Sequence, residues 1–237
     1  MRFCYVWCTE GSGFASKSYY GSGFFHMEMK VPGRDSAGVV TTFYMSQGKA
    51  QGNDELDFEF LGNREGKPYT LQTNVIVQGH GDREQKIQLW FDPTSSFHTY
   101  KILWNPYQIV FFVDNHPIRV FQNRTNIGAQ YPTQPMKVMG SIWNGEDWAT
   151  DGGKEKINWT YAPFKAQYQG FDVDGCTSGN FKTQLCSSSD LWWNSAQYQS
   201  LSATEESLYE YVKKNYLTYD YCSDKSRFPI PPPECPH

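Results

Sequence analysis

Short hydrophobic runs, separated by turn residues, follow one another from about residue 12 to residue 165. Some runs alternate apolar with polar positions and others are continuously apolar, which is typical of half-buried and fully buried strands. The runs cover residues 23–31, 38–45, 56–61, 69–77, 86–91, 100–104, 108–113 and 118–121. Turn signals such as Pro32-Gly33 and Asp114-Asn115 lie between them. Short strands joined by turns, without helices between them, predict an all-β jelly-roll sandwich.

The chain changes character after residue 165. Ser202 and Glu205 form a capping box, in which side-chain oxygens satisfy the free amides at the start of a helix. Apolar side chains then recur at helical spacing, namely at Leu208, Tyr211, Val212 and Tyr216. A short strand is expected at 219–221, and the prolines between residues 229 and 233 forbid regular structure beyond it. We therefore predict a β-sandwich over residues 1–165 and a C-terminal extension with one helix over residues 166–237.

The segment 55–61, Glu-Leu-Asp-Phe-Glu-Phe-Leu, alternates acidic with apolar residues. Because strand side chains alternate between two faces, Glu55, Asp57 and Glu59 point one way and their apolar neighbours point into a core. No Lys or Arg is interleaved, so the like charges repel one another and a purely structural strand would gain from replacing any of them. A solvated face and a calcium site are the simpler alternatives, but calcium favours loop ligands over a regular strand.

Glycoside hydrolysis with retention explains these carboxylates better. It needs two carboxyl groups about 5–5.5 Å apart, one as the nucleophile and one as the acid/base. Their pKa values must be split, and a third carboxyl between them can share a proton and maintain that split. Because a strand rises about 3.3 Å per residue, the Cα atoms of Glu55 and Glu59 are expected roughly 13 Å apart. The carboxyl groups therefore meet only if the strand is curved and the side chains lean together over a concave face.

Composition narrows the remaining classes. The 237 residues carry 21 basic and 25 acidic side chains and a net charge of −4, which predicts no nucleic-acid or membrane partner. No apolar stretch approaches the roughly 18–20 residues that span a bilayer. Aromatic residues make up 17% of the chain, enough for a core and for ring faces that stack on sugars. We expect a monomer with no cofactor and no metal site, and no His paired with a Ser or Cys in a nucleophilic triad.

The cysteines indicate an oxidising compartment. Six are present, at positions 4, 8, 176, 186, 222 and 235. The last four define two short loops, Cys176 to Cys186 and Cys222 to Cys235, and no spacing suggests zinc, so disulfides are favoured over reduced thiols. Sequons at Asn123 and Asn158 predict glycosylation and agree with secretion. No signal peptide is visible, so we expect a truncated or mis-started N-terminus.

Residues 53–62, Asn-Asp-Glu-Leu-Asp-Phe-Glu-Phe-Leu-Gly, resemble the His-Asp-Glu-Ile-Asp-Phe-Glu-Phe-Leu-Gly signature of plant xyloglucan endotransglucosylase/hydrolases, in glycoside hydrolase family 16. The resemblance covers about residues 11–235 and continues in motifs at residues 72–74, 81–85, 89–93, 117–120, 141–144, 147–150, 219–222, 227–229 and 233–235. It implies a concanavalin A-like jelly roll whose concave face holds a polysaccharide. It also implies that the C-terminal extension lengthens the acceptor side, and that the enzyme is secreted to the cell wall or apoplast.

The resemblance assigns roles to particular residues. Glu55 is the nucleophile, Glu59 the general acid/base and Asp57 the helper between them. Transfer of the cleaved chain to another xyloglucan end gives a transglucosylase, and transfer to water gives hydrolysis. The implied sugar contacts are Gln72, Thr73, Asn74, Asp82, Arg83, Glu84, Asp147, Trp148, Gly153 and Arg227. Without the resemblance, the same residues fit a solvated hairpin, a charged loop, a core tryptophan and a salt bridge within the disulfide loop.

The chain departs from the family at three places. Asn53 replaces the usual His, Asn63-Arg64-Glu65 is not a sequon, and residues 1–9 do not match, which predicts that a strand of the sandwich is absent. The short segment between Asn74 and Asp82 favours transfer. A xyloglucan-specific endo-hydrolase, an inactive truncated carbohydrate-binding copy and a wall protein on a legume-lectin-like sandwich remain alternatives, although a lectin has no use for three aligned carboxylates.

Overall fold

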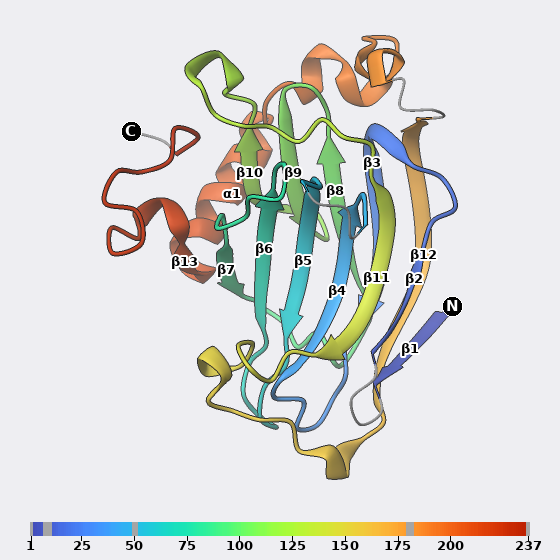
Figure 1. The fold of residues 1–237 in the computed structure, drawn as a ribbon, viewed down its shortest axis with the longest axis vertical. Helices are drawn as coiled ribbons and strands as arrows, with labels where there is room; N and C mark the ends of the chain where they lie inside the picture. Colours follow the sequence, from blue (N-terminus) through green and yellow to red (C-terminus); the bar gives the residue numbers. More distant parts are fainter. Residues whose placement is uncertain (1, 7–10, 49–51, 179–182, 236–237) are drawn as a thin grey trace.

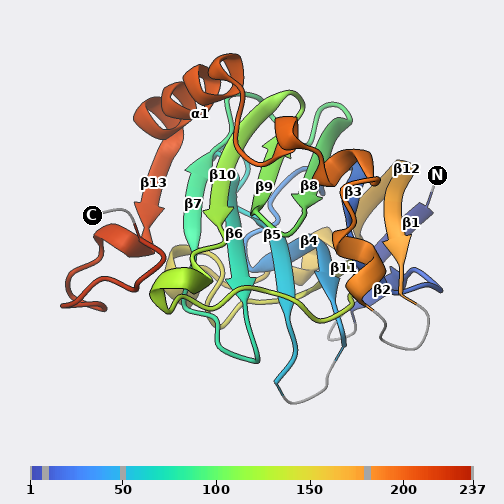
Figure 2. The ribbon, with the colours of Figure 1, turned by 90° about the horizontal axis from the view of Figure 1, so that it is seen from above.

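Two antiparallel sheets lie face to face in the computed structural model, which describes residues 2–6, 11–48, 52–178 and 183–235 (Figure 1). One sheet has the strand order β1 (Arg2–Val6), β12 (Phe164–Thr177), β3 (Tyr20–Lys30), β8 (His98–Trp104), β9 (Gln108–Val113) and β10 (His116–Gln122). The other has the order β13 (Leu217–Asp220), β7 (Gln85–Gln88), β6 (Thr70–Ile76), β5 (Glu55–Leu61), β4 (Val39–Ser46), β11 (Lys137–Asn144) and β2 (Ser12–Ala15). Figure 2 shows the two layers from above.

The core lies between the two sheets and is built from the inward residues of each strand. On β5, Leu56, Phe58 and Phe60 are fully buried. The ring of Phe58 stacks on Phe43 of β4 at 5.9 Å between centroids and meets Phe111 of the opposite sheet edge-on at 5.1 Å. Because alternate side chains of a strand face opposite ways, this packing fixes the outward direction of the acidic residues of β5.

The all-β sandwich predicted from the sequence is confirmed, and each strand predicted over residues 23–121 is present. No individual strand is predicted at the positions of β2, β11 and β12. Burial along β11 alternates, and its run Lys-Val-Met-Gly-Ser-Ile-Trp-Asn mixes small and polar residues with apolar ones, which weakens the hydrophobic signal. Residues Arg2–Val6 form β1 and pair with β12 at the edge of the six-stranded sheet. Cys8 lies outside the described residues.

Within its described residues, the C-terminal extension contains one α-helix, α1 (Ala203–Tyr216), as predicted. Ser202 accepts a hydrogen bond from the Glu205 amide, and the Glu205 carboxylate accepts one from the Ser202 amide, so the capping box is formed. Helix α1 packs against β10, and β13 pairs with β7 at the edge of the seven-stranded sheet. The predicted disulfides Cys176–Cys186 and Cys222–Cys235 are both present. The predicted boundary at residue 165 lies inside β12.

Seven short 3-10 helices complete the described parts, at Thr125–Ile127, Asp151–Gly153, Trp159–Tyr161, Thr183–Ser187, Trp192–Asn194, Ala196–Tyr198 and Tyr221–Ser223. Within the described ranges, no helix has both the length and the apolar character needed to cross a bilayer.

Candidate active site

Glu55, Asp57 and Glu59 line one cavity on the outer face of the seven-stranded sheet, the face turned away from the six-stranded sheet. The cavity measures about 400 Å³, and its other walls are Thr42, Tyr44, Ser46, Gly48, Asn53, Met139, Ser141 and Trp143. Strand β5 is central in this sheet, between β4 and β6, so the carboxyl groups lie in the middle of a wide surface. The strands of this sheet are visibly curved in Figure 1, as a meeting of the three side chains requires.

Asp57 is the most deeply placed of the three carboxyl groups, with 6% of its surface exposed. Burial raises its pKa well above the ordinary value, and the neighbouring charges of Glu55 and Glu59 and a hydrogen bond with Glu55 act in the same direction. The cation of Arg119, on the core side of the sheet, opposes this shift. Asp57 is therefore suited to hold a proton and to donate it in a hydrogen bond to Glu55.

Glu59 has the environment of a general acid. Burial raises its pKa from 4.5 to about 7, and the charges of Glu55 and Glu84 add to the rise. The Gln72 amide donates a hydrogen bond to Glu59 Oε2 at 2.6 Å and, together with the cation of Lys86, lowers the pKa. A carboxyl group poised near neutrality can both give and take a proton at physiological pH.

Glu55 is held by two neighbours at the start of β5. Asn53 donates from Nδ2 to Glu55 Oε2 at 3.2 Å and lies 3.4 Å from Ser46 Oγ. Asp54 is buried, and its carboxylate accepts hydrogen bonds of 2.7–2.9 Å from backbone amides of residues 78, 133 and 134. Asn53, which replaces the family's usual His, thus contacts the candidate nucleophile directly, and Asp54 fixes the backbone just before Glu55.

A cross-strand row runs across the outer face through Glu59. Its members are Ser141, Thr42, Glu59, Gln72, Lys86 and Tyr219, each opposite the next in the strand register. Thr42 and Ser141 share a hydrogen bond of 2.7 Å, and Lys86 Nζ lies 5.7 Å from the Tyr219 ring centroid. Sequence reasoning missed Thr42, Tyr44, Lys86, Tyr219 and Trp143 as parts of the site. Lys86 and Tyr219 can be assigned to the site only once β13 is known to pair with β7.

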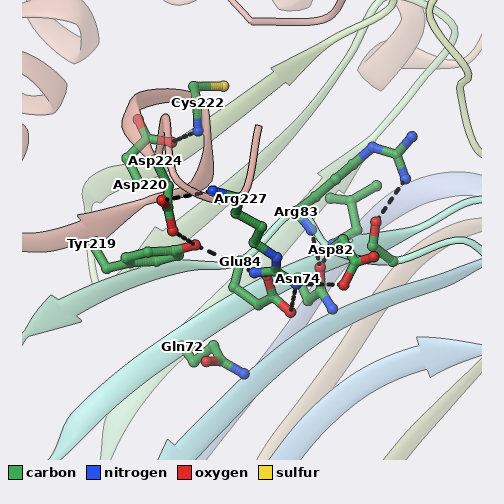
Figure 3. Close-up of polar contacts among 12 residues, drawn as sticks. Gln72, Asn74, Asp82, Arg83, Glu84, Tyr219, Asp220, Cys222, Asp224 and Arg227 are labelled. Carbon is green, nitrogen blue, oxygen red and sulfur yellow. Dashed lines mark hydrogen bonds and ion pairs between the residues drawn. The ribbon is translucent and has the colours of Figure 1, made fainter. Parts of the chain in front are cut away.

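Three predicted sugar contacts gather where the C-terminal extension meets β7. Arg227 forms ion pairs with Asp82 and, at 2.7 Å, with Glu84 (Figure 3). The Tyr219 hydroxyl lies 3.3 Å from Arg227 and donates to Asp224 at 3.0 Å. The extension therefore places a cation and a phenol at one end of the row through Glu59.

Two predicted sugar contacts are turned away from this face. Thr73 is opposite Phe58 and faces the core, where its hydroxyl and its carbonyl oxygen accept hydrogen bonds from the buried Arg119. The alternation along β6 explains this, because Gln72 and Asn74 already occupy the outer face. Arg83 donates from Nε to Glu234 at 2.5 Å, and its side chain is only 11% exposed. It therefore ties the C-terminal tail to the loop before β7. Sugar contacts at Thr73 and Arg83 stay predictions, and both side chains already have protein partners.

Asp147, Trp148 and Gly153 belong to the loop that follows β11, beside the cavity wall Trp143. Trp148 is 37% exposed, and its ring centroid lies 5.9 Å from that of Trp143, a cavity wall. Asp147 is highly exposed and pairs with Lys156 at 3.1 Å. Gly153 has a φ of 84°, and a Cβ there would collide with the Asp147 carbonyl, so only glycine closes this loop. The loop therefore extends the indole surface of the cavity wall Trp143.

The comparisons with known proteins agree with this geometry. Residues 5–161 match the model of glycosyl hydrolases family 16. The chain belongs to this family. Residues 187–235 match a second model, the xyloglucan endo-transglycosylase C-terminus. Membership makes the protein a retaining enzyme that transfers or hydrolyses glycosyl groups.

Relatives of this family 16 chain include two plant proteins. Xyloglucan endotransglucosylase/hydrolase protein 2 of Arabidopsis thaliana is 60% identical over 96% of this chain and 78% of its own length. A probable xyloglucan endotransglucosylase/hydrolase 1 of Solanum lycopersicum is 51% identical over 96% of this chain and 77% of its own length. Among solved structures, a Bacillus licheniformis β-glucanase is 30% identical with a TM-score of 0.55, covering 66% of this chain and 67% of its own.

Other predictions for this family 16 chain concern its surface. The two disulfides fit a protein that matures in an oxidising compartment. Asn158 is exposed, and its side-chain Oδ1 accepts hydrogen bonds from Thr160. The Asn123 side-chain nitrogen, by contrast, donates to the Pro106 carbonyl at 2.7 Å. A glycan on Asn158 therefore disturbs less than one on Asn123.

One contact went against the sequence analysis. His98 bonds Ser96 at 3.0 Å and Asp114 at 2.9 Å, a Ser–His–Asp chain that was not expected. Asp114 also accepts a hydrogen bond from the Thr99 amide, and the His98 ring stacks on Phe91 at 3.5 Å, so the chain fastens β8 to the turn between β9 and β10. Among the residues that the structure describes, no group of three or more His, Cys, Asp or Glu is placed to hold a metal ion.

Proposed function

We propose that the protein is a xyloglucan endotransglucosylase that uses Glu55 as nucleophile, Glu59 as acid/base and Asp57 as the residue that assists Glu55. The observation that carries this proposal is the set of three outward carboxyl groups on β5, which line one cavity in which burial raises the pKa of Asp57 and of Glu59. The names of the plant relatives support xyloglucan as the substrate.

In the first step, a Glu55 oxygen attacks the anomeric carbon of a backbone glucosyl residue. The bond from that carbon to the bridging oxygen breaks, and Glu59 gives its proton to the departing oxygen. The product is a glycosyl ester on Glu55 and an ionised Glu59. Asp57 supports this step because its raised pKa lets it remain a hydrogen-bond donor to Glu55.

In the second step, the 4-hydroxyl of another xyloglucan end enters the cavity. Glu59 takes the hydroxyl proton, the hydroxyl oxygen attacks the anomeric carbon, and the ester to Glu55 breaks. The configuration at the anomeric carbon is retained because it has been inverted twice. Water in place of the hydroxyl gives hydrolysis, which we propose as the minor outcome.

The outer face offers sugar contacts on both sides of Glu59. Trp143 and Trp148 supply indole surface on one side, and Gln72, Asn74, Asp82, Glu84 and Arg227 supply polar groups on the other. Amide and guanidinium groups are suited to the hydroxyls of a glucan, and indoles to its apolar ring faces. We propose that the acceptor lies on the side of the extension, and that the enzyme acts as a secreted monomer in the plant cell wall.

The test is product sizing after incubation with xyloglucan and a fluorescent xyloglucan oligosaccharide. We expect label to move into polymer. A matched control is Glu65→Gln, which makes the same kind of change on an exposed turn, beside Glu55→Gln. Label transfer by wild type and Glu65→Gln but not by Glu55→Gln supports the proposal. A falling polymer size without label identifies a hydrolase, and no change in the polymer overturns the assignment of substrate.

A further inference from the structure

The C-terminal extension reaches the neighbourhood of Glu59 through one side chain. Arg227 donates to Glu84 Oε2 at 2.7 Å and also pairs with Asp82 (Figure 3). Glu84 directly precedes β7, and Lys86 of β7 is opposite Gln72, which donates to Glu59. The Tyr221 amide donates to the Glu84 carbonyl at 3.2 Å, so the backbone of the extension also fixes this position.

The two acidic partners of Arg227 differ in their surroundings. The Glu84 side chain is 19% exposed, whereas the Asp82 side chain is 72% exposed. Water screens the charge of an exposed carboxylate, and a charge held against the protein acts over a longer distance. Glu84 is therefore placed to influence the site electrostatically, and Asp82 is not.

We propose, on the basis of the proposed function, that Glu84 is a positioning residue that favours the protonated form of Glu59, and that Arg227 suppresses this effect by its ion pair. Sugar bound against the extension takes hydrogen bonds from Arg227 and weakens its ion pair with Glu84. The freed Glu84 charge then makes Glu59 a better base. Occupation of the acceptor side and the proton affinity of Glu59 are thereby coupled.

The other charges around Glu59 do not provide such a coupling. Glu55 and Asp57 lie on the same strand and change only with the reaction itself. Lys86 of β7, which is opposite Gln72, lowers the pKa of Glu59, and it contacts the extension through the uncharged ring of Tyr219. Strand β4 presents the uncharged Thr42 opposite Glu59 and the phenol of Tyr44 opposite Asp57. Among these groups, only Glu84 is held by a residue that acceptor sugar is expected to touch.

The coupling has a consequence for the fate of the glycosyl-enzyme. An acceptor chain that occupies the extension raises the basicity of Glu59 at the moment its hydroxyl must be deprotonated. Water reaches the ester without touching Arg227 and meets a weaker base. The same enzyme therefore favours transfer over hydrolysis when acceptor is bound.

The experiment measures the titration of Glu59 by NMR, with carboxyl-¹³C glutamate in the complete chain and Glu59→Gln to assign its signal. We expect Glu84→Gln to shift the midpoint to lower pH than the wild-type value, and Arg227→Gln to shift it to higher pH. In the double variant, Arg227→Gln should have no further effect. Asp82→Asn is the matched control, because it also removes a partner of Arg227, and we expect the midpoint to stay in place.

A second arm adds a xyloglucan oligosaccharide, which should raise the midpoint in wild type but not in Glu84→Gln. The proposal is overturned if Glu84→Gln leaves the titration midpoint of Glu59 unchanged. It is also overturned if Arg227→Gln still shifts this midpoint in the double variant, or if Asp82→Asn shifts it as much as Glu84→Gln does. Oligosaccharide that binds without moving the wild-type midpoint overturns the coupling. Failure of the chain to act on xyloglucan overturns the proposed function instead, and the titrations of the free variants remain decisive for Glu84.

Discussion

Gln72 donates a hydrogen bond of 2.6 Å to Glu59, and this contact opposes the burial that keeps Glu59 protonated. A donor to a carboxylate stabilises its charged form and lowers its pKa. The pKa of Glu59 near 7 is therefore a balance between burial with nearby negative charge and a single strong donor with one cation. Each side of this balance can be changed separately.

Removing the donor should move the alkaline limb of the pH–rate profile. In Gln72→Leu the ionised form of Glu59 loses its hydrogen bond, so we expect the fall in kcat to occur at higher pH than in wild type. Because Gln72 is also a proposed sugar contact, KM is expected to rise as well. The measurement is kcat and KM for transfer from pH 4 to pH 9.

The control is Gln88→Leu, the same substitution at an exposed position of the neighbouring strand β7. It should leave the limb where it is. A limb that moves to lower pH in Gln72→Leu contradicts the assignment of Glu59 as the group that loses its proton.

The raised pKa of Glu59 also predicts a pH-dependent stability. The native state binds the proton more tightly than the unfolded state, so stability falls as pH rises from 4.5 to about 7 and is constant beyond that window. A shift of this size corresponds to about 3 kcal/mol. Glu59→Gln should therefore raise the free energy of unfolding by up to about 3 kcal/mol at pH 8 and by little at pH 4.

Urea unfolding of both proteins at the two pH values provides the measurement. Equal gains at pH 4 and pH 8 would show that the amide packs better and that ionisation of Glu59 is not involved.

Asp54 is predicted to be the main stabilising carboxylate near the site. It is 1% exposed and accepts hydrogen bonds from three backbone amides. Asp54→Ala removes all three hydrogen bonds at once and should lower the free energy of unfolding by about 3 kcal/mol or more. Asp147→Ala, at a highly exposed carboxylate, should change it by less than about 1 kcal/mol. Thermal or urea unfolding of both variants tests the contrast, and similar losses would refute it.

The buried pair Arg83–Glu234 should hold the C-terminal tail in place. The Glu234 side chain is only 2% exposed, so Arg83→Met leaves a buried charge without its partner. We expect a loss of about 3–5 kcal/mol, and a smaller loss in the double variant with Glu234→Gln. Unfolding measurements combined with limited proteolysis near residue 234 test this. A double variant that loses as much as the sum of both single variants would show that the two residues are not coupled.

The three outward carboxyl groups of β5 could be predicted because they follow from one local sequence pattern. Alternation over seven residues of β5 fixes both the buried and the outward face. The same rule places Thr73 on the face opposite to that of Gln72 and Asn74, so the prediction of a sugar contact at Thr73 rests on the family motif alone. The partner of Arg83 is 151 residues away along the chain, and no local pattern links it to Glu234.

The row through Lys86 and Tyr219 could not be predicted for the same reason. It depends on β13 joining β7, a pairing between segments separated by more than a hundred residues. The raised pKa values of Asp57 and Glu59 likewise depend on burial among side chains of the neighbouring strands, which the sequence indicates only as a requirement of the chemistry.

The roles of Glu55 and Glu59 differ in a way that leaving-group chemistry can separate. Glu55→Ala removes the nucleophile, so transfer should fall by at least about 10³-fold with every donor, because nucleophile losses are large in covalent catalysis. Glu59→Gln cannot protonate the departing oxygen. It should therefore cripple cleavage of the natural glucan but spare formation of the glycosyl-enzyme from an aryl glycoside, whose phenolate leaves without a proton.

The measurement is the rate of each variant with xyloglucan and with a nitrophenyl xyloglucan oligosaccharide, with circular dichroism as the check on folding. Azide should rescue Glu55→Ala by taking the place of the lost carboxylate, and it should give the product of inverted configuration from that variant. It should also rescue breakdown of the glycosyl-enzyme in Glu59→Gln, where it needs no base, and that product retains the configuration. If both variants gave the same configuration, the assignment of the two roles would have to be abandoned, because only the variant that lacks the covalent intermediate can invert.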